Sequence, residues 1–173
     1  MFRKSTSNLF IAALSLFLFS SVFSVQAQAK INLPVNRVAV DARLMDPTYS
    51  TNYIIVPEEA MKKSPHLELL TKYTKNALDY LKMEEAKKGK LKVFINFQII
   101  RSKKMEVTYT IRAFEAEKEK WRVSASCSAR HNADANEIMP ALVASALYYI
   151  GQDKKDKAFV VNKYPLYVNA VMK

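Results

Sequence analysis

The sequence predicts an α+β fold, in which two helices pack on an antiparallel sheet of about four to five strands. Two observations support this class. Apolar side chains alternate strictly with other residues between Leu91 and Ala129, which is the period of strands with one buried face. Ahead of this stretch, apolar residues recur at helical spacing. The predicted order is β-β-α-β-β-β-α, followed by an apolar C-terminal tail that docks on the body.

Residues 1–29 are predicted to be a cleavable export signal rather than an uncleaved membrane anchor. Arg3 and Lys4 give a positive start, an apolar run follows, and a small-x-small pattern ends at Ala29. The apolar run is shorter than the ~20 residues of a membrane span. We therefore expect cleavage after Ala29 and a periplasmic or secreted location. Residues 30–173 are then expected to form a single α+β domain without a transmembrane span.

Two strands are predicted ahead of the first helix. Residues 36–44 alternate between apolar and other side chains, and a turn follows at Asp46 and Pro47. Residues 49–56 are rich in β-branched and aromatic side chains, which favour strands.

The first helix is predicted over residues 65–87. Ser64 is suited to cap its start, and Pro65 suits the first helical position. Gly89 is the expected left-handed stop after the last turn. The apolar stripe of this helix contains Leu67, Leu70, Thr74, Ala77, Leu78 and Leu81.

Three further strands are predicted over residues 91–99, 105–113 and 121–129. Short polar turns join them, which favours an antiparallel arrangement. Cys127 lies on the apolar side of the last strand, so we expect a buried, inert thiol rather than an intermolecular bridge. Trp121 lies on the same side and is expected to anchor the core. The inward set is Leu91, Val93, Ile95, Phe97, Ile99, Met105, Val107, Tyr109, Ile111, Ala113, Trp121, Val123, Ala125, Cys127 and Ala129.

A second helix is predicted over residues 137–150. Asp134 and Glu137 fit a capping box, whereas Pro140 implies a later start or a kink. Residues 157–173 are strongly apolar, and we expect them to dock on the body as a strand or a helix.

Several segments together resemble a known family. They are TYSTNYIIVPE around the second strand, AKKGKLKVFINFQI, IRAFEAEKEKWRVSASCSA, and Tyr164-Pro165 beyond the last helix. In these segments the chain resembles the bacterial envelope proteins, many of them lipoproteins, catalogued as domain of unknown function 4136. It departs from them by lacking the lipidation cysteine and the glycine ahead of the Trp-led strand. The resemblance implies a fold and an envelope location, and it implies no chemistry.

The sequence contains no recognisable motif for catalysis, cofactor binding or metal binding. Its 2 glycines exclude Gly-rich phosphate-binding loops, and its 2 histidines and 1 cysteine lack the spacing of metal ligands. Ser126, His131 and Asp134 have the residue types of a catalytic triad, but nothing in the pattern positions a base against the hydroxyl. We therefore predict that the protein is not an enzyme and has no cofactor.

The formal net charge of +11 bears on the choice of partner. Such a charge attracts anionic partners, but the lysines are spread along the chain without a block of like charges, which favours an ordinary lysine-rich surface without a specific partner. Because export separates the protein from nucleic acid, the candidate partners are an anionic envelope component or another envelope protein.

The outward sides of the three central strands form a candidate ligand-binding face. Small polar residues, two phenylalanines and several cations occur there, which suits an anionic or glycan-like ligand or a partner protein. The alternatives are a solvated sheet face, or a face covered by the second helix or the tail. The candidate residues are Lys92, Phe94, Arg112, Phe114, Arg122 and Arg130.

These features favour an exported, non-enzymatic binding or interaction protein of the envelope or periplasm. The alternative is a secreted inhibitor with a cystatin-like fold, in which one long sheet wraps around the first helix alone. An enzyme of an unrecognised type comes third. The packing of the helices separates the first two classes.

Overall fold

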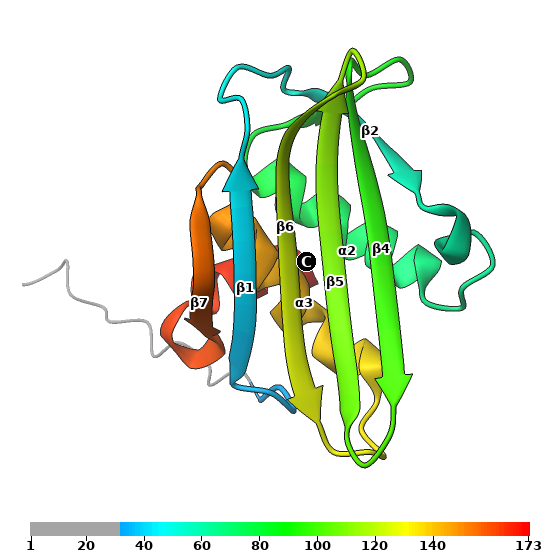
Figure 1. Cartoon of the computed structure of the whole chain (residues 1–173), viewed down its shortest axis with the longest axis vertical. Coiled ribbons are helices and arrows are strands. Elements are labelled where there is room, and N and C mark those ends of the chain that lie inside the picture. Colours follow the sequence, from blue (N-terminus) through cyan, green and yellow to red (C-terminus); the bar gives the residue numbers. More distant parts are fainter. Residues whose placement is uncertain (1–31) are drawn as a thin grey trace, which may run out of the picture. The chain divides into compact units, whose positions relative to one another are not determined.

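The computed structural model describes residues 32–173, which form a mixed sheet with helices on one face (Figure 1). The strand order is β3-β2-β4-β5-β6-β1-β7. The predicted α+β class is confirmed. The predicted numbers of four to five antiparallel strands and two helices were too low, because the described residues contain seven strands and three α-helices. The predicted signal peptide, residues 1–29, lies outside the described residues.

The elements have the following bounds. The strands are β1 (Arg37–Leu44), β2 (Asn52–Pro57), β3 (Glu84–Glu85), β4 (Leu91–Arg101), β5 (Met105–Glu115), β6 (Lys118–Ala129) and β7 (Lys154–Val160). The α-helices are α2 (Leu67–Tyr80), α3 (Ala135–Tyr149) and α4 (Pro165–Met172), and two 3₁₀ turns are η1 (Glu59–Met61) and η2 (Val161–Lys163). None of the helices within residues 32–173 is long and apolar enough to cross a membrane.

Strands β4, β5 and β6 form the predicted antiparallel meander. Ile95 pairs with Ile111, and Ile111 pairs with Val123. Burial alternates along all three strands, and every predicted inward side chain is buried except Ile99 and Ala129, which are half-buried at the strand ends. Strict alternation puts one side of each strand into the core, so the period-two pattern was a sufficient guide.

The single thiol of the chain is buried. Cys127 is 9% exposed, and burial raises the pKa of its thiol to about 11. Because the thiolate is the reactive form, we expect negligible reaction of native protein with a disulfide reagent at pH 8. The same reagent should label one thiol per chain in denaturant, with a Cys127→Ser variant as the blank. Rapid stoichiometric labelling of the native protein would contradict the buried position.

The second strand corrects the predicted antiparallel topology. Strand β2 runs parallel to β4, with Tyr53 opposite Leu91 and Val56 opposite Phe94. The connection between them contains η1 and α2, and a crossover of this length returns the chain in the same direction. The short strand β3 then pairs parallel with β2 at the edge of the sheet.

Helix α2 is shorter than predicted at both ends. The Ser64 hydroxyl accepts a hydrogen bond from the backbone N–H of His66 (3.2 Å), and the helix begins at Leu67, so Pro65 precedes it. The helix ends at Tyr80, and Lys82 takes the left-handed conformation (φ 61°) that was expected of Gly89. The following residues leave the helix because they pair with β2.

Gly89 serves a different purpose from a helix stop. A Cβ atom at this position would lie 2.4 Å from the carbonyl carbon of Tyr53 in β2. The chain therefore passes so close to the backbone of β2 that a side chain does not fit.

Helix α3 lies at the centre of the helix layer and is buried on nearly all sides. It contacts β1, β5 and β6 on one side, and it also contacts α2 and α4. The Asp134 carboxylate accepts a hydrogen bond from the backbone N–H of Asn136 (2.8 Å), and the helix begins at Ala135. Of the two alternatives predicted from Pro140, a later start was wrong, because the helix begins at Ala135 and Pro140 lies inside it.

The tail docks as predicted, as both a strand and a helix. Strand β7 pairs with β1, and α4 packs on α3. The side-chain amide of Asn76 in α2 donates to the carbonyl of Val171 (2.8 Å), which ties the end of α4 to the body. Three helices therefore pack together on one side of the sheet, unlike a cystatin-like fold with one wrapped helix.

Strand β7 forms one edge of the sheet, next to β1 (Figure 1). Its first five residues, 154–158, are exposed and include three lysines. The backbone N–H of Asp156 donates to the Asp41 carboxylate (2.8 Å), and Asp156 has a positive φ of 52°. The pairing with β1 is irregular between Val40 and Ala42, so this edge is not a regular ladder.

Candidate functional site

The sheet face opposite the helices is the open face, because no helix of residues 32–173 covers it (Figure 1). Its centre consists of small polar side chains in cross-strand register. Asn96 lies opposite Thr110, Thr110 opposite Ser124, and Ser124 opposite Asp41. These side chains are exposed or half-buried. The prediction that the outward face could be covered by the second helix or the tail is therefore not met within this part of the chain.

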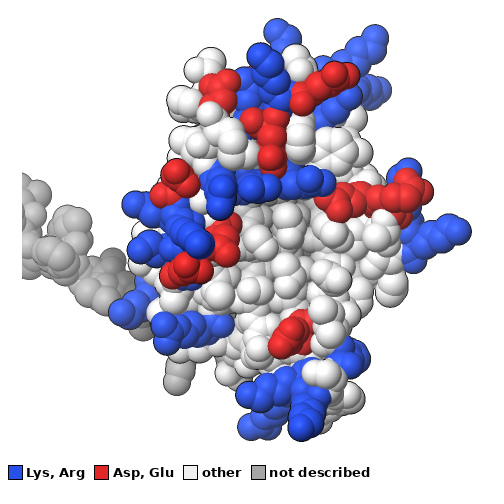
Figure 2. All heavy atoms as spheres, viewed as in Figure 1, with Lys and Arg blue, Asp and Glu red and all other residues white. Residues whose placement is uncertain are grey.

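Three arginines lie side by side on the open face, and we call them the arginine row. Arg112 of β5 pairs with Arg122 of β6, and Arg122 pairs with Arg43 of β1. Adjacent strands are about 4.8 Å apart, and like charges directly opposite each other destabilise a sheet. Figure 2 shows basic side chains forming a band across this face, beside an uncharged region.

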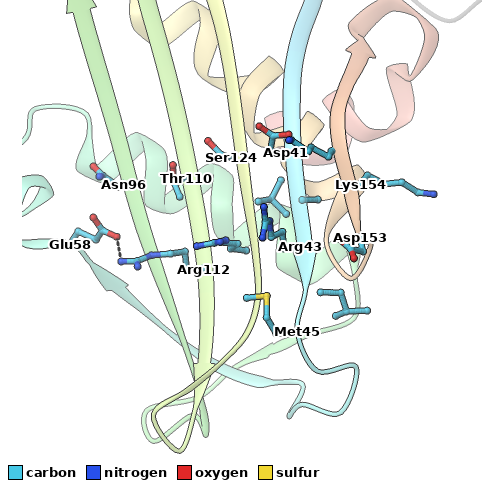
Figure 3. Close-up of a pocket in the computed structure, with 15 residues that line it drawn as sticks. Asp41, Arg43, Met45, Glu58, Asn96, Thr110, Arg112, Ser124, Asp153 and Lys154 are labelled. Atoms are coloured by element: carbon cyan, nitrogen blue, oxygen red, sulfur yellow. Dashed lines mark hydrogen bonds and ion pairs between the residues drawn. The ribbon is translucent and has the colours of Figure 1, made fainter.

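One carboxylate neutralises one end of the row. The Glu58 carboxylate lies 2.5 Å from the Arg112 guanidinium, as the dashed line in Figure 3 marks. In the described part of the chain, Arg43 and Arg122 form no ion pair within 4.0 Å. Both side chains are exposed. The row therefore has one neutralised end and two adjacent cations that no carboxylate contacts.

The arginine row borders an open hollow of about 910 Å³ (Figure 3). Small polar side chains form its floor, and the end of β1 and the start of β7 form one wall. Five basic residues outnumber three acidic ones around it, so the hollow favours an anion. The charged lining residues are Arg43, Arg112, Arg122, Lys154, Lys155, Asp41, Glu58 and Asp153.

A second hollow of about 540 Å³ adjoins the first and shares Arg112 with it. The rings of Phe94 and Phe114 meet edge to face, with centroids 5.4 Å apart, and we call them the aromatic pair. The Arg112 guanidinium carbon lies 5.6 Å from the centroid of the Phe114 ring. Both rings are half-buried, so they retain apolar surface at the open face.

Five of the six predicted site residues lie on the open face. Lys92, Phe94, Arg112 and Phe114 line the aromatic hollow, and Arg122 belongs to the arginine row. The sixth, Arg130, follows the end of β6 and lines a separate hollow at the other end of the sheet. At about 3.3 Å per residue, it is roughly 25 Å along the chain from Arg122. Arg130 is therefore not part of this site.

Sequence reasoning missed Arg43. The alternation of β1 already put Arg43 on its outward side, but nothing in the sequence paired β1 with β6. That pairing is non-local, since Arg43 lies opposite Arg122. The signal that could have identified Arg43 as a site residue was its outward position on a strand.

The residue types of a catalytic triad that the sequence contains, Ser126, His131 and Asp134, are not joined by hydrogen bonds in the described part of the chain. Residues 32–173 hold no group of three or more His, Cys, Asp or Glu side chains placed to bind a metal ion. The Nδ1 atom of His66 lies 2.8 Å from the Asn136 side chain. Asp134 is occupied as a helix cap, and no hydrogen bond within residues 32–173 joins Ser126 to His131.

The fold and the open face define an α+β protein with one helix-covered and one exposed sheet face. No protein-family model matches this chain, and no curated protein matches it.

Several solved structures are similar to it, including the following two. One is a PDZ domain protein from Parabacteroides distasonis, with 10% sequence identity and a TM-score of 0.56. The match covers 72% of this chain and 39% of the PDZ domain protein. This chain thus spans about two fifths of that protein, and the likeness shows the fold alone. The other is PelC from Paraburkholderia phytofirmans, solved as a dodecamer, with 8% sequence identity and a TM-score of 0.49. The match covers 68% of this chain and 99% of the PelC chain.

Proposed function

We propose that this protein is an exported, non-enzymatic binding protein of the bacterial envelope, and that its open face binds an anionic partner. The arginine row is the observation that carries the proposal. Arg43 and Arg122 lie opposite each other without a carboxylate contact among the described residues. An anion between the two guanidinium groups would accept hydrogen bonds from both and remove their mutual repulsion.

The sequence supports the location in this proposal. Residues 1–29 have the charge, apolar run and small-residue end of an export signal. The segments that resemble the envelope family cover the second strand, the meander and the end of the chain. An anionic component of the envelope is the corresponding partner.

The other function classes have less support. The cystatin-like inhibitor was expected to wrap its sheet around one helix, whereas α2, α3 and α4 pack against one another on the same side of the sheet here. An enzyme of an unrecognised type would need a base positioned against a reactive group, and no observation on the described residues favours one: of the carboxylates around the hollow, Glu58 is paired with Arg112.

The proposal is tested with a double variant, Arg43→Gln with Arg122→Gln, and tripolyphosphate as the anionic probe. We expect a loss of about tenfold or more in affinity by isothermal titration calorimetry, since charge-assisted hydrogen bonds from both residues are removed. The matched control is Lys103→Gln with Lys104→Gln, which removes the same charge at the other end of the sheet. An equal loss in both variants would show that binding follows net charge alone, and it would overturn the proposal.

A further inference from the structure

We infer that the ligand of the open face is an amphiphilic anion, whose charged group lies at Arg43 and Arg122 and whose apolar part lies on Phe94 and Phe114. This inference rests on the proposed binding function of the same face. It adds the chemical class of the ligand and the direction in which the ligand lies across the strands.

The strand register supplies the first argument. One row of outward residues crosses five neighbouring strands, and its character changes from apolar to cationic along the way. From β2 to β1, this row consists of Val56, Phe94, Arg112, Arg122 and Arg43. At about 4.8 Å per strand, the backbone positions of Phe94 and Arg122 are roughly 10 Å apart. A single small molecule can therefore contact both halves of the row.

Arg112 supplies the second argument, because it separates the two halves without adding net charge. Its guanidinium is paired with Glu58 and lies near the Phe114 ring. It also lines both hollows. With Arg112 neutralised, Arg43 and Arg122 are the two cations that lie opposite each other without an ion pair among the described residues, whereas the aromatic hollow has one further cation, Lys92. The stem of Arg112 and the aromatic pair continue the surface toward β4.

The aromatic pair supplies the third argument, because a purely hydrophilic polyanion would leave it unused. On the neighbouring strand β2, the apolar residues Ile54 and Val56 lie opposite Lys92 and Phe94 of this hollow. Apolar groups gain free energy when they leave water for such a surface. A ligand that carries hydrocarbon next to its charge uses both hollows.

The test uses octyl phosphate below its micelle concentration, with inorganic phosphate and octyl glucoside for comparison. Calorimetry should show octyl phosphate binding at least about tenfold more tightly than inorganic phosphate, as expected for burial of two or more methylene groups. Octyl glucoside, which has the chain without the charge, should show no measurable binding.

The variants assign the two parts of the ligand to the two halves of the row. Phe94→Ser with Phe114→Ser should bring octyl phosphate to the affinity of inorganic phosphate and change the phosphate affinity by less than about twofold. The control is Ile100→Ser. Ile100 is an apolar residue of β4, the strand that contains Phe94, and it is 50% exposed. This variant should change neither the octyl phosphate affinity nor the phosphate affinity.

The outcomes separate the inference from the function on which it rests. If wild-type protein binds octyl phosphate no better than phosphate, or if the serine variants bind it as tightly as wild type, the inference is overturned. The binding function stands in that case, provided that Arg43→Gln with Arg122→Gln still weakens phosphate binding. Binding to phosphatidylglycerol vesicles without binding to monomeric octyl phosphate would identify a membrane surface instead, and would also overturn the inference.

Discussion

Replacing Trp121 with alanine is expected to lower the free energy of unfolding by about 3–5 kcal/mol, the usual loss for a large aromatic core residue. Trp121 is fully buried at the inner side of β6, opposite Ala113 of β5 and Leu44 of β1. Its ring also meets Tyr49 edge to face, with centroids 6.3 Å apart. The alanine variant would leave a cavity where three strands and a loop meet. Urea unfolding followed by far-ultraviolet circular dichroism measures the loss without relying on tryptophan fluorescence.

Trp121→Phe provides the matched comparison. The indole N–H of Trp121 is buried without a hydrogen-bond partner among the described residues. Trp121→Phe leaves a smaller cavity than Trp121→Ala does. It also removes an unpaired donor, whose burial costs about 1–3 kcal/mol. We therefore expect the phenylalanine variant to lose no more than about 1.5 kcal/mol, because the two effects oppose each other. A loss as large as that of Trp121→Ala would mean that the indole N–H is satisfied in solution.

Gly89→Ala is expected to lower the free energy of unfolding by about 2–3 kcal/mol, through overpacking against a strand. The added Cβ would lie 2.4 Å from the carbonyl carbon and 2.6 Å from the carbonyl oxygen of Tyr53, and 2.8 Å from the nitrogen of Ile54. These are backbone atoms of β2, which pairs with β3 and β4 and has little freedom to move. The chain before β4 would have to shift instead.

Gly151→Ala is the control for the glycine prediction. Gly151 has a φ of 77°, but a Cβ there would meet only the Tyr49 hydroxyl, at 3.5 Å. Its cost comes from the left-handed backbone and amounts to about 1 kcal/mol. Chemical denaturation of the two variants measures the difference. A smaller loss at Gly89 than at Gly151 would contradict the close approach of residue 89 to β2.

The sequence was a good guide wherever burial repeats within one element. The alternation in residues 91–129 located β4, β5 and β6, together with nearly all of their inward side chains. It also indicated the buried positions of Trp121 and Cys127. These are local consequences of the pleat, since neighbouring side chains on a strand point to opposite faces.

The sequence was a poor guide to which strands are neighbours. The parallel pairing of β2 with β4 and the pairing of β1 with β6 join residues far apart in the chain, and short periodic patterns carry no information about such partners. The end of α2 was misplaced for a related reason, because pairing of Glu84–Glu85 with β2 overrides the helical preference of that segment. Arg43 was missed as a site residue because its position depends on this non-local pairing.

The irregular, lysine-bearing edge at β7 also limits how molecules of this protein can associate. A further strand that hydrogen-bonded to this edge would have to lie along exposed Lys154, Lys155 and Lys157, and desolvating these ammonium groups is unfavourable. The positive φ at Asp156 and the irregular pairing with β1 further disrupt the straight row of donors and acceptors that a fibril-forming segment would need. At high concentration, this edge therefore protects the folded protein from growing its sheet into aggregates.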